Sequence, residues 1–535
     1  MTHLRVAVDI GGTFTDLCIL DEDRGKLDIA KIPSTRDPLE GVFNGLEAAG
    51  VDLGRVSLFT HGTTVATNAL ITRRLPATAM VLTRGFRDVI EIRRGTRQDL
   101  WDTYRDTAPP YVRRRDRFVV TERTDYSGCI AEPLDEDEAR ALAARLHRRG
   151  YRAIAICFMN AYANPHNELR LKALLEEAMP GVAISTSSEV LPEIFEHERF
   201  STTVVNAALN PLVGEYAMRL GEALGARGYR HDLLLLHSGG GVMTARNAAR
   251  FGGRLAGSGI AAGAIASRHI AQACGYENAI GLDMGGTSCD VSLVYGGETR
   301  VTKDWYIEYG YPICFPSIEV LTIGAGGGSL AWIDEAGSLH NGPQSAGAEP
   351  GPACYGRGGE RPTNTDANLV LGRLGAHLAG GGVSLDVAAA ERAIGAHVGE
   401  PLGLSLIAAA KAILSVANAN MADAVRVISI RRGYDPRDFA LVAFGGAGAL
   451  HGVALAKELS IPVVIVPPHP GVTSALGCLL VDIRHDLATT YLIPAERADP
   501  TKIEAEFRAL EREAVARLTA ESVAPADMLL KRSID

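Results

Sequence analysis

The chain has 535 residues, of which 47% are hydrophobic and 22% charged, and its formal net charge is −9. This composition is typical of a globular protein, and the length allows roughly two to four domains. Because the balance is acidic and Arg113 to Arg115 form its longest basic run, we expect no nucleic-acid partner.

The cysteines and the N-terminus bear on the compartment. The eight cysteines are scattered, without a Cys-x-x-Cys pair, which fits a reducing environment. The first five residues lead directly into an apolar strand without the features of a signal peptide, and no uninterrupted apolar run reaches membrane-spanning length. We therefore expect a cytoplasmic protein with no membrane partner.

The first predicted element is an apolar strand, a glycine turn and a second apolar strand over residues 6–20. Its pattern Asp-x-Gly-Gly-Thr-x-x-Asp, from Asp9 to Asp16, recurs once, from Asp283 to Asp290. A turn without Cβ atoms lets backbone N–H groups approach a phosphate closely. The alternative is a tight hairpin in a chain with 58 glycines, but two copies at identical spacing favour phosphate binding.

The next elements are a strand over residues 26–32 and a helix over 38–49. The resulting β-β-β-α order resembles a nucleotide-binding half of an actin-like or sugar-kinase-like ATPase. In the strand and helix start over 58–70, Thr63, Thr64 and Asn68 are either helix caps or ligand contacts, and His61 is either structural or functional.

A strand over 79–83, helices over 136–149 and 168–178 and a strand over 153–159 predict an alternating β/α unit. Between them, residues 85–125 are rich in Arg, Asp and Tyr. They form either an insertion that reaches toward a substrate or partner subunit or a solvated surface, and we favour the second for most of the arginines. A helical connector follows over 202–224, with a domain boundary expected near residue 198. The small residues of 255–265 indicate either tight packing or a helix N-terminus that faces an anion.

After the second turn, residues 321–359 form a long irregular region, and such loops tend to be functional or mobile. A helix over 405–431 and a strand over 439–444 follow. The strand leads into Gly445, Gly446 and Ala447, then a helix from Ala449. Glycines at such a junction let the backbone lie against a flat ligand, so we expect these three residues to line an adenosine site.

Five stretches together resemble the hydantoinase A and 5-oxoprolinase family, within the actin, sugar-kinase and heat-shock-chaperone ATPase superfamily: residues 8–16, 60–64, 282–288, 347–358 and 444–451. The resemblance implies an α/β fold with two actin-like or ribonuclease-H-like lobes and a cleft between them. The lobes would span residues 1–198 and 199–490. Because relatives continue past Asp535, residues 491–535 are expected to be the start of a truncated C-terminal domain.

The resemblance also implies a function. ATP and Mg²⁺ would be the cofactors of a hydrolase subunit that phosphorylates the carbonyl oxygen of a cyclic amide, such as a hydantoin, 5-oxoproline or a lactam, before ring opening. The alternatives are the ATPase subunit of an acetone or acetophenone carboxylase and a nucleotide-binding regulatory or inactive homologue. A hydantoinase B-type subunit is the expected partner, in an oligomer.

The candidate site residues come from the two turns. Asp9 and Asp283 are expected to hold Mg²⁺ or position water, and Asp16 and Asp290 are further catalytic candidates that could instead cap their hairpins. The residues expected to cradle phosphates are Gly11, Gly12, Thr13, Gly285, Gly286 and Thr287. The chain has no Gly-x-Ser-x-Gly or His-Glu-x-x-His motif, which argues against a serine hydrolase or a zinc amidohydrolase.

Overall fold

A computed structural model describes residues 3–11, 14–35, 37–105, 107–378 and 383–534. The chain forms two compact units that are interleaved in sequence. The first contains Met1–Ser57, Gly259–Val301 and Ile318–Val481, and the second contains Leu58–Ser258, Thr302–Ser317 and Asp482–Asp535. The domain boundary expected near residue 198 and the cleft between lobes stay predictions.

The N-terminal part of the first unit is an antiparallel meander with a helix on each face. Its strands are β1 (Leu4–Ile10), β2 (Phe14–Asp21) and β3 (Lys26–Pro33), and its helices are α1 (Pro38–Ala48) and α15 (Thr473–Leu479). Helix α1 begins with Asp37 as its cap, whose side chain accepts a hydrogen bond from Leu39 N–H. The β-β-β-α order predicted from the sequence is therefore present.

A second sheet of the first unit carries the second copy of the turn. Its strands are β13 (Ala279–Met284), β14 (Cys289–Tyr295), β15 (Glu298–Thr299), β18 (Val320–Ile323), β23 (Ala440–Phe444) and β24 (Val463–Ile465). Strand β13 is antiparallel to β14 and parallel to β23. Alternate residues of β13 face opposite cores: Ile280 and Leu282 pack against α13 (Leu406–Ile428) and α14 (Gly445–Leu459).

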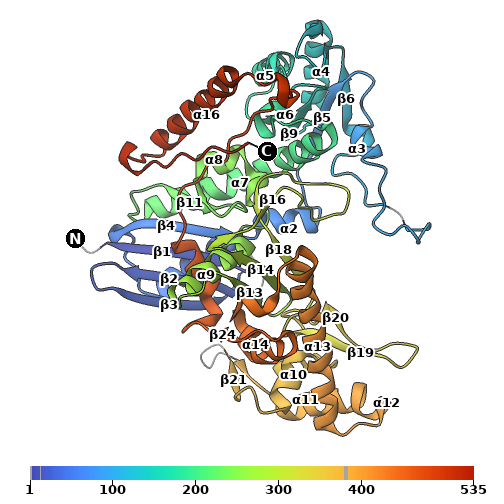
Figure 1. Ribbon diagram of the computed structural model, residues 1–535, viewed down its shortest axis with the longest axis vertical. Coiled ribbons are helices and arrows are strands. Elements are labelled where there is room, and N and C mark those ends of the chain that lie inside the picture. The colour runs from blue at the N-terminus through green and yellow to red at the C-terminus, as the bar shows by residue number, and fades with distance from the viewer. Residues whose placement is uncertain (1–2, 12–13, 36, 106, 379–382, 535) are drawn as a thin grey trace. The chain divides into compact units, whose positions relative to one another are not determined.

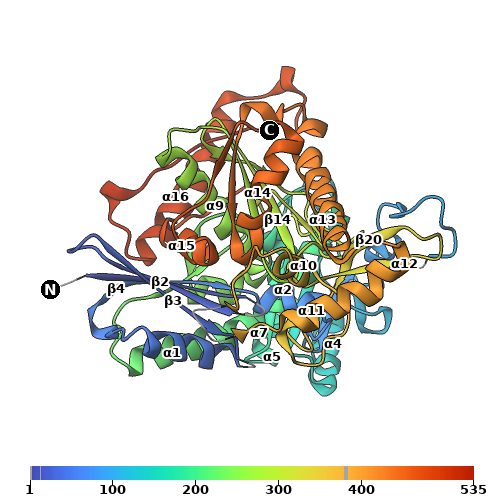
Figure 2. The same ribbon diagram turned by 90° about the horizontal axis from the view of Figure 1, so that it is seen from below.

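The opposite face of this sheet is covered by α9 (Ser258–Ala273), through Ala271 and the strand residues Ala279 and Val442. Figure 2 shows β14 between α9 and α13. The remaining elements of the first unit are β19 (Ser329–Ile333), β20 (Leu339–Ser345), α10 (Asn364–Val370), β21 (His377–Leu378), β22 (Val383–Ser384), α11 (Val387–Ile394) and α12 (Glu400–Leu402). The irregular region 321–359 therefore contains a strand pair.

Helix α13 and the turn after it, residues 406–432, are long and apolar enough to cross a membrane by length and composition alone. Half of this apolar window is buried inside the protein. Its Ile413 and Leu414 pack with α10, and its Met421 and Val425 pack with β13 and β14. We therefore assign this helix to the core of the first unit.

The second unit is built on a parallel sheet in the order β10-β9-β5-β6 (Ala183–Thr186, Ala153–Cys157, Thr78–Thr83 and Arg117–Val120). Helices α4 (Glu136–Arg149) and α5 (His166–Ala178) pack on one face, and α7 (Glu196–Ala226) packs on the other. Figure 1 shows these helices on the two sides of the strands. The helix predicted over 136–149 is confirmed, with Asp135 as its cap and Gly150 in the left-handed conformation at its end.

A smaller group of strands follows: β4 (Val56–Thr63), which belongs to the second unit from Leu58 onward, is parallel to β11 (Leu233–Leu236), which is antiparallel to β12 (Val242–Thr244). The other elements of this unit are α2 (Val65–Ile71), α3 (Val89–Ile92), β7 (Arg123–Thr124), β8 (Ile130–Glu132), α6 (Ser187–Val190), α8 (Ala245–Arg250) and α16 (Pro500–Ala520).

The C-terminal segment is attached to the second unit by buried polar contacts. Glu521, directly after α16, accepts a hydrogen bond from Asn247 Nδ2 at 2.6 Å and lies 2.5 Å from His485 Nε2. The fully buried His237 accepts a hydrogen bond at Nδ1 from Gly239 N–H, and its Nε2 lies 3.2 Å from Arg484 O. Since only a neutral ring accepts at one nitrogen and donates at the other, the fold selects neutral His237.

This arrangement predicts that acid destabilises the second unit. Burial, with the nearby positive charge of Arg254, lowers the pKa of His237 from 6.5 to about 3. The unfolded chain therefore takes up the proton first, so the stabilisation is complete above pH 6.5 and is lost as the pH falls. Between about pH 7.5 and about pH 5, the wild type should lose about 2 kcal/mol of unfolding free energy more than His237→Gln.

Urea denaturation at the two pH values measures this difference. Each protein is compared with itself at the two pH values, so a loss of stability that the glutamine causes equally at both pH values does not affect the difference. An equal pH dependence of the two proteins would contradict the prediction.

Candidate active site

The four aspartates of the repeated pattern form two cross-strand pairs. Asp9 of β1 lies opposite Asp16 of β2. Asp283 of β13 lies opposite Asp290 of β14. All four belong to the first unit, and the negative charges of both Asp16 and Asp283 raise the pKa of Asp9. The structure thus brings the predicted carboxylates into one electrostatic environment.

The two turns also close in the same way. Gly11 N–H donates to Phe14 O at 2.9 Å, and Gly285 N–H donates to Ser288 O at 3.0 Å. These bonds occupy equivalent positions of the repeat, so the sequence repeat is also a structural one. Of the remaining turn residues, Gly286 and Thr287 are exposed, and Gly12 and Thr13 lie outside the described residues.

Asp9 is the most isolated of the four carboxylates. Its Oδ1 is buried and has no hydrogen-bond partner among the described residues. Burial is the main cause that raises the pKa of Asp9 to about 7, and the attraction of Lys31 opposes the shift. A buried carboxylate oxygen without a partner is unfavourable unless a ligand or cation completes it.

Asp16 is paired with a lysine that the sequence reasoning missed. Lys31 of β3 lies directly across from Asp16, and its Nζ is 2.6 Å from Asp16 Oδ1. The same Nζ donates to the carbonyl oxygen of Gly471 at 2.9 Å. Burial nevertheless raises the pKa of Asp16, against the effect of this lysine. The pairing of Lys31 with Asp16 could have been predicted from the sequence, because the short turn between β2 and β3 fixes which residues of the two antiparallel strands lie opposite each other.

Asp283 and Asp290 each accept a hydrogen bond from a hydroxyl group. Ser474 Oγ of α15 donates to Asp283 Oδ2 at 2.9 Å, and Thr322 Oγ1 of β18 donates to Asp290 Oδ1. Burial raises the pKa of Asp283 to about 6 and that of Asp290 to about 7, the latter also through the charge of Asp283. Neither hydroxyl was identified from the sequence, because both come from distant segments.

Helix α9 passes close to both leading aspartates through two glycines one turn apart. A Cβ atom on Gly259 would lie 3.5 Å from Asp9 Oδ1, and one on Gly263 would lie 3.3 Å from Asp283 Oδ2. The small residues of 255–265 therefore allow close packing, and the alternative that the N-terminus of α9 faces an anion stays a prediction. Larger side chains here would fill the space in front of the carboxylates.

The junction of β23 and α14 lies against Asp283. Gly445 has a φ of +82°, and a Cβ atom there would lie 2.4 Å from Asp283 Oδ1. Helix α14 starts at Gly445, four residues earlier than the predicted start at Ala449, and Phe444 at its cap makes no side-chain hydrogen bond. The first N–H groups of the helix, which include those of Gly446 and Ala447, are thus left without a side-chain cap.

A second glycine run supports the turn after β13. Gly327 N–H donates to Gly285 O at 3.0 Å, and Gly328 N–H donates to Gly286 O at 2.7 Å. A Cβ atom on Gly326 would lie 2.5 Å from Thr287 N. The sequence placed these glycines in an irregular region, and their role as a backing for the second turn was not predicted.

Four residues between 58 and 70 were candidates for structural or ligand-binding roles, and the structure shows their contacts within the protein. The buried His61 has its Nε2 2.6 Å from Tyr216 Oη. Val65 N–H donates to Thr63 Oγ1, and Asn68 Nδ2 donates to Thr64 Oγ1. Thr64 lies at the start of α2 but makes no capping hydrogen bond through its side chain, so the helix-cap interpretation is wrong for Thr64. Ligand contacts by Thr63, Thr64 and Asn68 and a functional role of His61 stay predictions.

The donor set fits Mg²⁺ bound together with phosphates. No group of three His, Cys, Asp or Glu side chains in the described part of the chain is arranged to hold a metal ion. Mg²⁺ commonly binds through one or two carboxylates and keeps waters or substrate phosphates as its other ligands. The buried, unpartnered Asp9 Oδ1 and the neighbouring Asp283 suit such a site.

These features define an α/β protein with a duplicated glycine turn and buried acidic residues. Family profiles match almost the whole chain: the Hydantoinase/oxoprolinase N-terminal region over residues 5–179, and Hydantoinase/oxoprolinase over residues 199–487. The chain therefore belongs to the hydantoinase/oxoprolinase family. The family expected from the sequence is confirmed.

Two of the relatives are named as enzyme subunits. The chain is 39% identical to the caprolactamase subunit alpha of Pseudomonas jessenii, over 95% of this chain and 73% of the relative. It is 35% identical to the acetophenone carboxylase gamma subunit of Aromatoleum aromaticum, over 90% of this chain and 68% of the relative.

Solved structures agree with this assignment. The crystal structure of the ATP-dependent caprolactamase from Pseudomonas jessenii matches with a TM-score of 0.87 and 38% identity, over 96% of this chain and 76% of that one. The nucleotide-free structure of acetone carboxylase matches with a TM-score of 0.80 and 27% identity, over 98% and 78%. The α/β fold class is confirmed.

The contact between Gly445 and Asp283 gives a testable pair of substitutions. Gly445→Ala places a Cβ atom on a residue with positive φ and against the carboxylate, so it should lower the unfolding free energy by more than about 1 kcal/mol. Gly446→Ala is the matched control, because a Cβ atom there meets no other atom within 4 Å. Thermal unfolding compares the two variants. Equal melting temperatures would contradict the positive φ of Gly445 and its close approach to Asp283.

Proposed function

We propose that this chain is the ATP-dependent subunit of an enzyme that opens cyclic amides. The observation that carries the proposal is the repeated glycine turn with four aspartates in one unit, in a chain 39% identical to a caprolactamase subunit. The substrate class is a lactam, a hydantoin or 5-oxoproline.

The chemistry explains why ATP is needed. An amide carbonyl is a poor electrophile because its nitrogen lone pair is delocalised into the C=O bond. ATP, when bound, supplies the phosphoryl group that turns the carbonyl oxygen into a leaving group. Water would then attack the carbon and the C–N bond would break, which leaves the ring-opened amine as an acyl phosphate. A second water would hydrolyse the acyl phosphate, so a lactam, ATP and two waters would give the ring-opened amino acid, ADP and phosphate.

The chain's own residues would bind and orient the reactants. Asp9 and Asp283 would hold Mg²⁺, which neutralises phosphate charge, and the backbone N–H groups of the two turns would face the phosphates. Lys31 keeps Asp16 oriented through their 2.6 Å contact. The adenosine would lie against the uncapped start of α14, at Gly445, Gly446 and Ala447.

A carboxylase is the second candidate, favoured by the 35% identity to the acetophenone carboxylase gamma subunit. In that reaction the activated oxygen would belong to a ketone, and bicarbonate would supply the carbon. The aspartates and turns would have the same roles in both reactions, so they do not separate the two candidates. A nucleotide-binding regulatory protein is the third candidate.

A second subunit is part of the proposal. The two relatives are named as subunits, alpha of caprolactamase and gamma of acetophenone carboxylase. We propose a hydantoinase B-type partner and assembly into an oligomer in the cytoplasm. The proposed lobes are residues 1–198 and 199–490, followed by 491–535.

Phosphate release from Mg·ATP tests the proposal. The purified chain, alone and with its B-type subunit, is supplied with caprolactam, hydantoins or 5-oxoproline, and with acetone or acetophenone plus bicarbonate. Asp9→Asn should lower the substrate-stimulated rate by about 100-fold or more, because it removes one group that stabilises transition-state charge. The matched control is Asp28→Asn, an exposed aspartate of β3, which should keep the wild-type rate.

The outcomes separate the candidates. Stimulation by a cyclic amide supports the hydrolase, and stimulation by a ketone with bicarbonate supports the carboxylase. ATP binding without stimulation by any substrate would favour a regulatory protein. An unchanged rate in Asp9→Asn would contradict the assigned site.

A further inference from the structure

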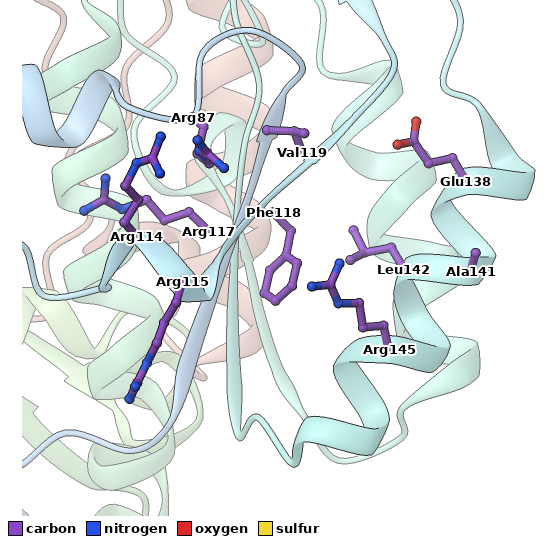
Figure 3. Close-up of a pocket in the computed structure, with 10 residues that line it drawn as sticks. All are labelled: Arg87, Arg114, Arg115, Arg117, Phe118, Val119, Glu138, Ala141, Leu142 and Arg145. Carbon is purple, nitrogen blue, oxygen red and sulfur yellow. The ribbon is translucent and has the colours of Figure 1, made fainter.

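A cavity of about 750 Å³ lies in the second unit, beside the edge strand β6 and helix α4. Five arginines line it, together with apolar side chains that include Phe118, and Glu138 is the one acidic residue among its described lining. Figure 3 shows the guanidinium groups of Arg87, Arg114 and Arg117 gathered on one side of the strand, and Arg145 with Phe118 on the other. Its size is within the usual range for small-molecule sites.

The first side of the cavity has more positive than negative charge. Asp88 Oδ1 lies 3.1 Å from Arg114 Nε, 3.7 Å from Arg117 Nη1 and 3.7 Å from Arg87 Nε. One carboxylate is therefore shared by three guanidinium groups. The hydrogen bonds from Arg114 hold the pKa of Asp88 below its usual range, so this carboxylate is ionised at neutral pH.

Two N–H donors on this side have no hydrogen-bond acceptor among the described residues, because Asp88 Oδ1 lies 3.7 Å from each of them. The side chain of Arg117 is fully buried, its Nε donates to Val112 O at 3.0 Å, and its Nη2 donates to Glu91 Oε2 at 2.6 Å. Its Nη1, like the Nε of Arg87, is buried without a hydrogen-bond partner in the described part of the chain. Buried donors on a cation are unfavourable unless an acceptor completes them, and a ligand oxygen would do so.

The other side of the cavity combines a cation with apolar surface. The guanidinium of Arg145 lies 5.1 Å from the centre of the Phe118 ring. Leu142, one turn earlier on α4, lines the same wall. Within the described residues, no carboxylate lies at ion-pair distance from Arg145. This guanidinium is thus available to a second negative group or to the far end of a longer anion.

We propose that this cavity binds a small organic anion with at least two negative charges, either a phosphate monoester or a polycarboxylate. Planar guanidinium groups bind both kinds of anion through paired hydrogen bonds. The site goes beyond the proposed function, because its lining belongs to the second unit and the four aspartates belong to the first.

Isothermal titration calorimetry of the full chain tests the proposal, with phenyl phosphate and citrate as probes. The buffer contains no Mg²⁺ and about 0.15 M salt, so that weak surface attraction is screened. Arg87→Gln and Arg145→Gln should each weaken binding about tenfold, because each removes a charged donor. The matched control Arg148→Gln changes an exposed arginine of α4 outside the cavity and should keep the wild-type affinity.

Saturable binding of either probe supports the site. The probe that binds more tightly identifies the kind of anion, phosphate monoester or polycarboxylate. Asp9→Asn should retain this binding, which separates the test from that of the proposed function. Absence of binding by both probes, or equal affinities in all three arginine variants, would overturn the proposal. Binding of polyglutamate in the absence of binding by either probe would also overturn it and indicate an acidic protein segment.

Discussion

The first unit depends on holding four carboxylates near one another in largely buried surroundings. Burial and mutual repulsion both oppose ionisation, and they raise the pKa of Asp9 to about 7 and that of Asp283 to about 6. The register of the two hairpins fixes the pairs, and Lys31 forms an ion pair with Asp16. A protein gains nothing in stability from such a cluster, and this is the physical reason for proposing a cation site there.

Glycine residues allow the backbones of two helices to pack directly against these carboxylates. Gly259 and Gly263 bring α9 against Asp9 and Asp283, and Gly445 brings the start of α14 against Asp283. At each position a Cβ atom would approach the carboxylate to contact distance or less. The glycines therefore keep open the space in which phosphates and a cation would be bound.

The sequence was sufficient for local features. The repeat predicted both hairpins, and the amphipathic pattern of residues 136–149 predicted the bounds of α4, which the structure confirms. The partners of the aspartates were not predicted, because Ser474 and Thr322 approach through long-range packing that no local pattern encodes. The start of α14 was placed too late, because glycine was interpreted only as a loop former.

The interleaving of the two units has a consequence for biosynthesis. The first unit begins with residues 1–57 and ends at residue 481, so its N-terminal meander leaves the ribosome long before α15, the helix that covers one face of it. The second unit is also incomplete until its last segment, 482–535, is made. During most of its synthesis the chain therefore exposes apolar strands, a state in which chaperones protect nascent proteins from aggregation.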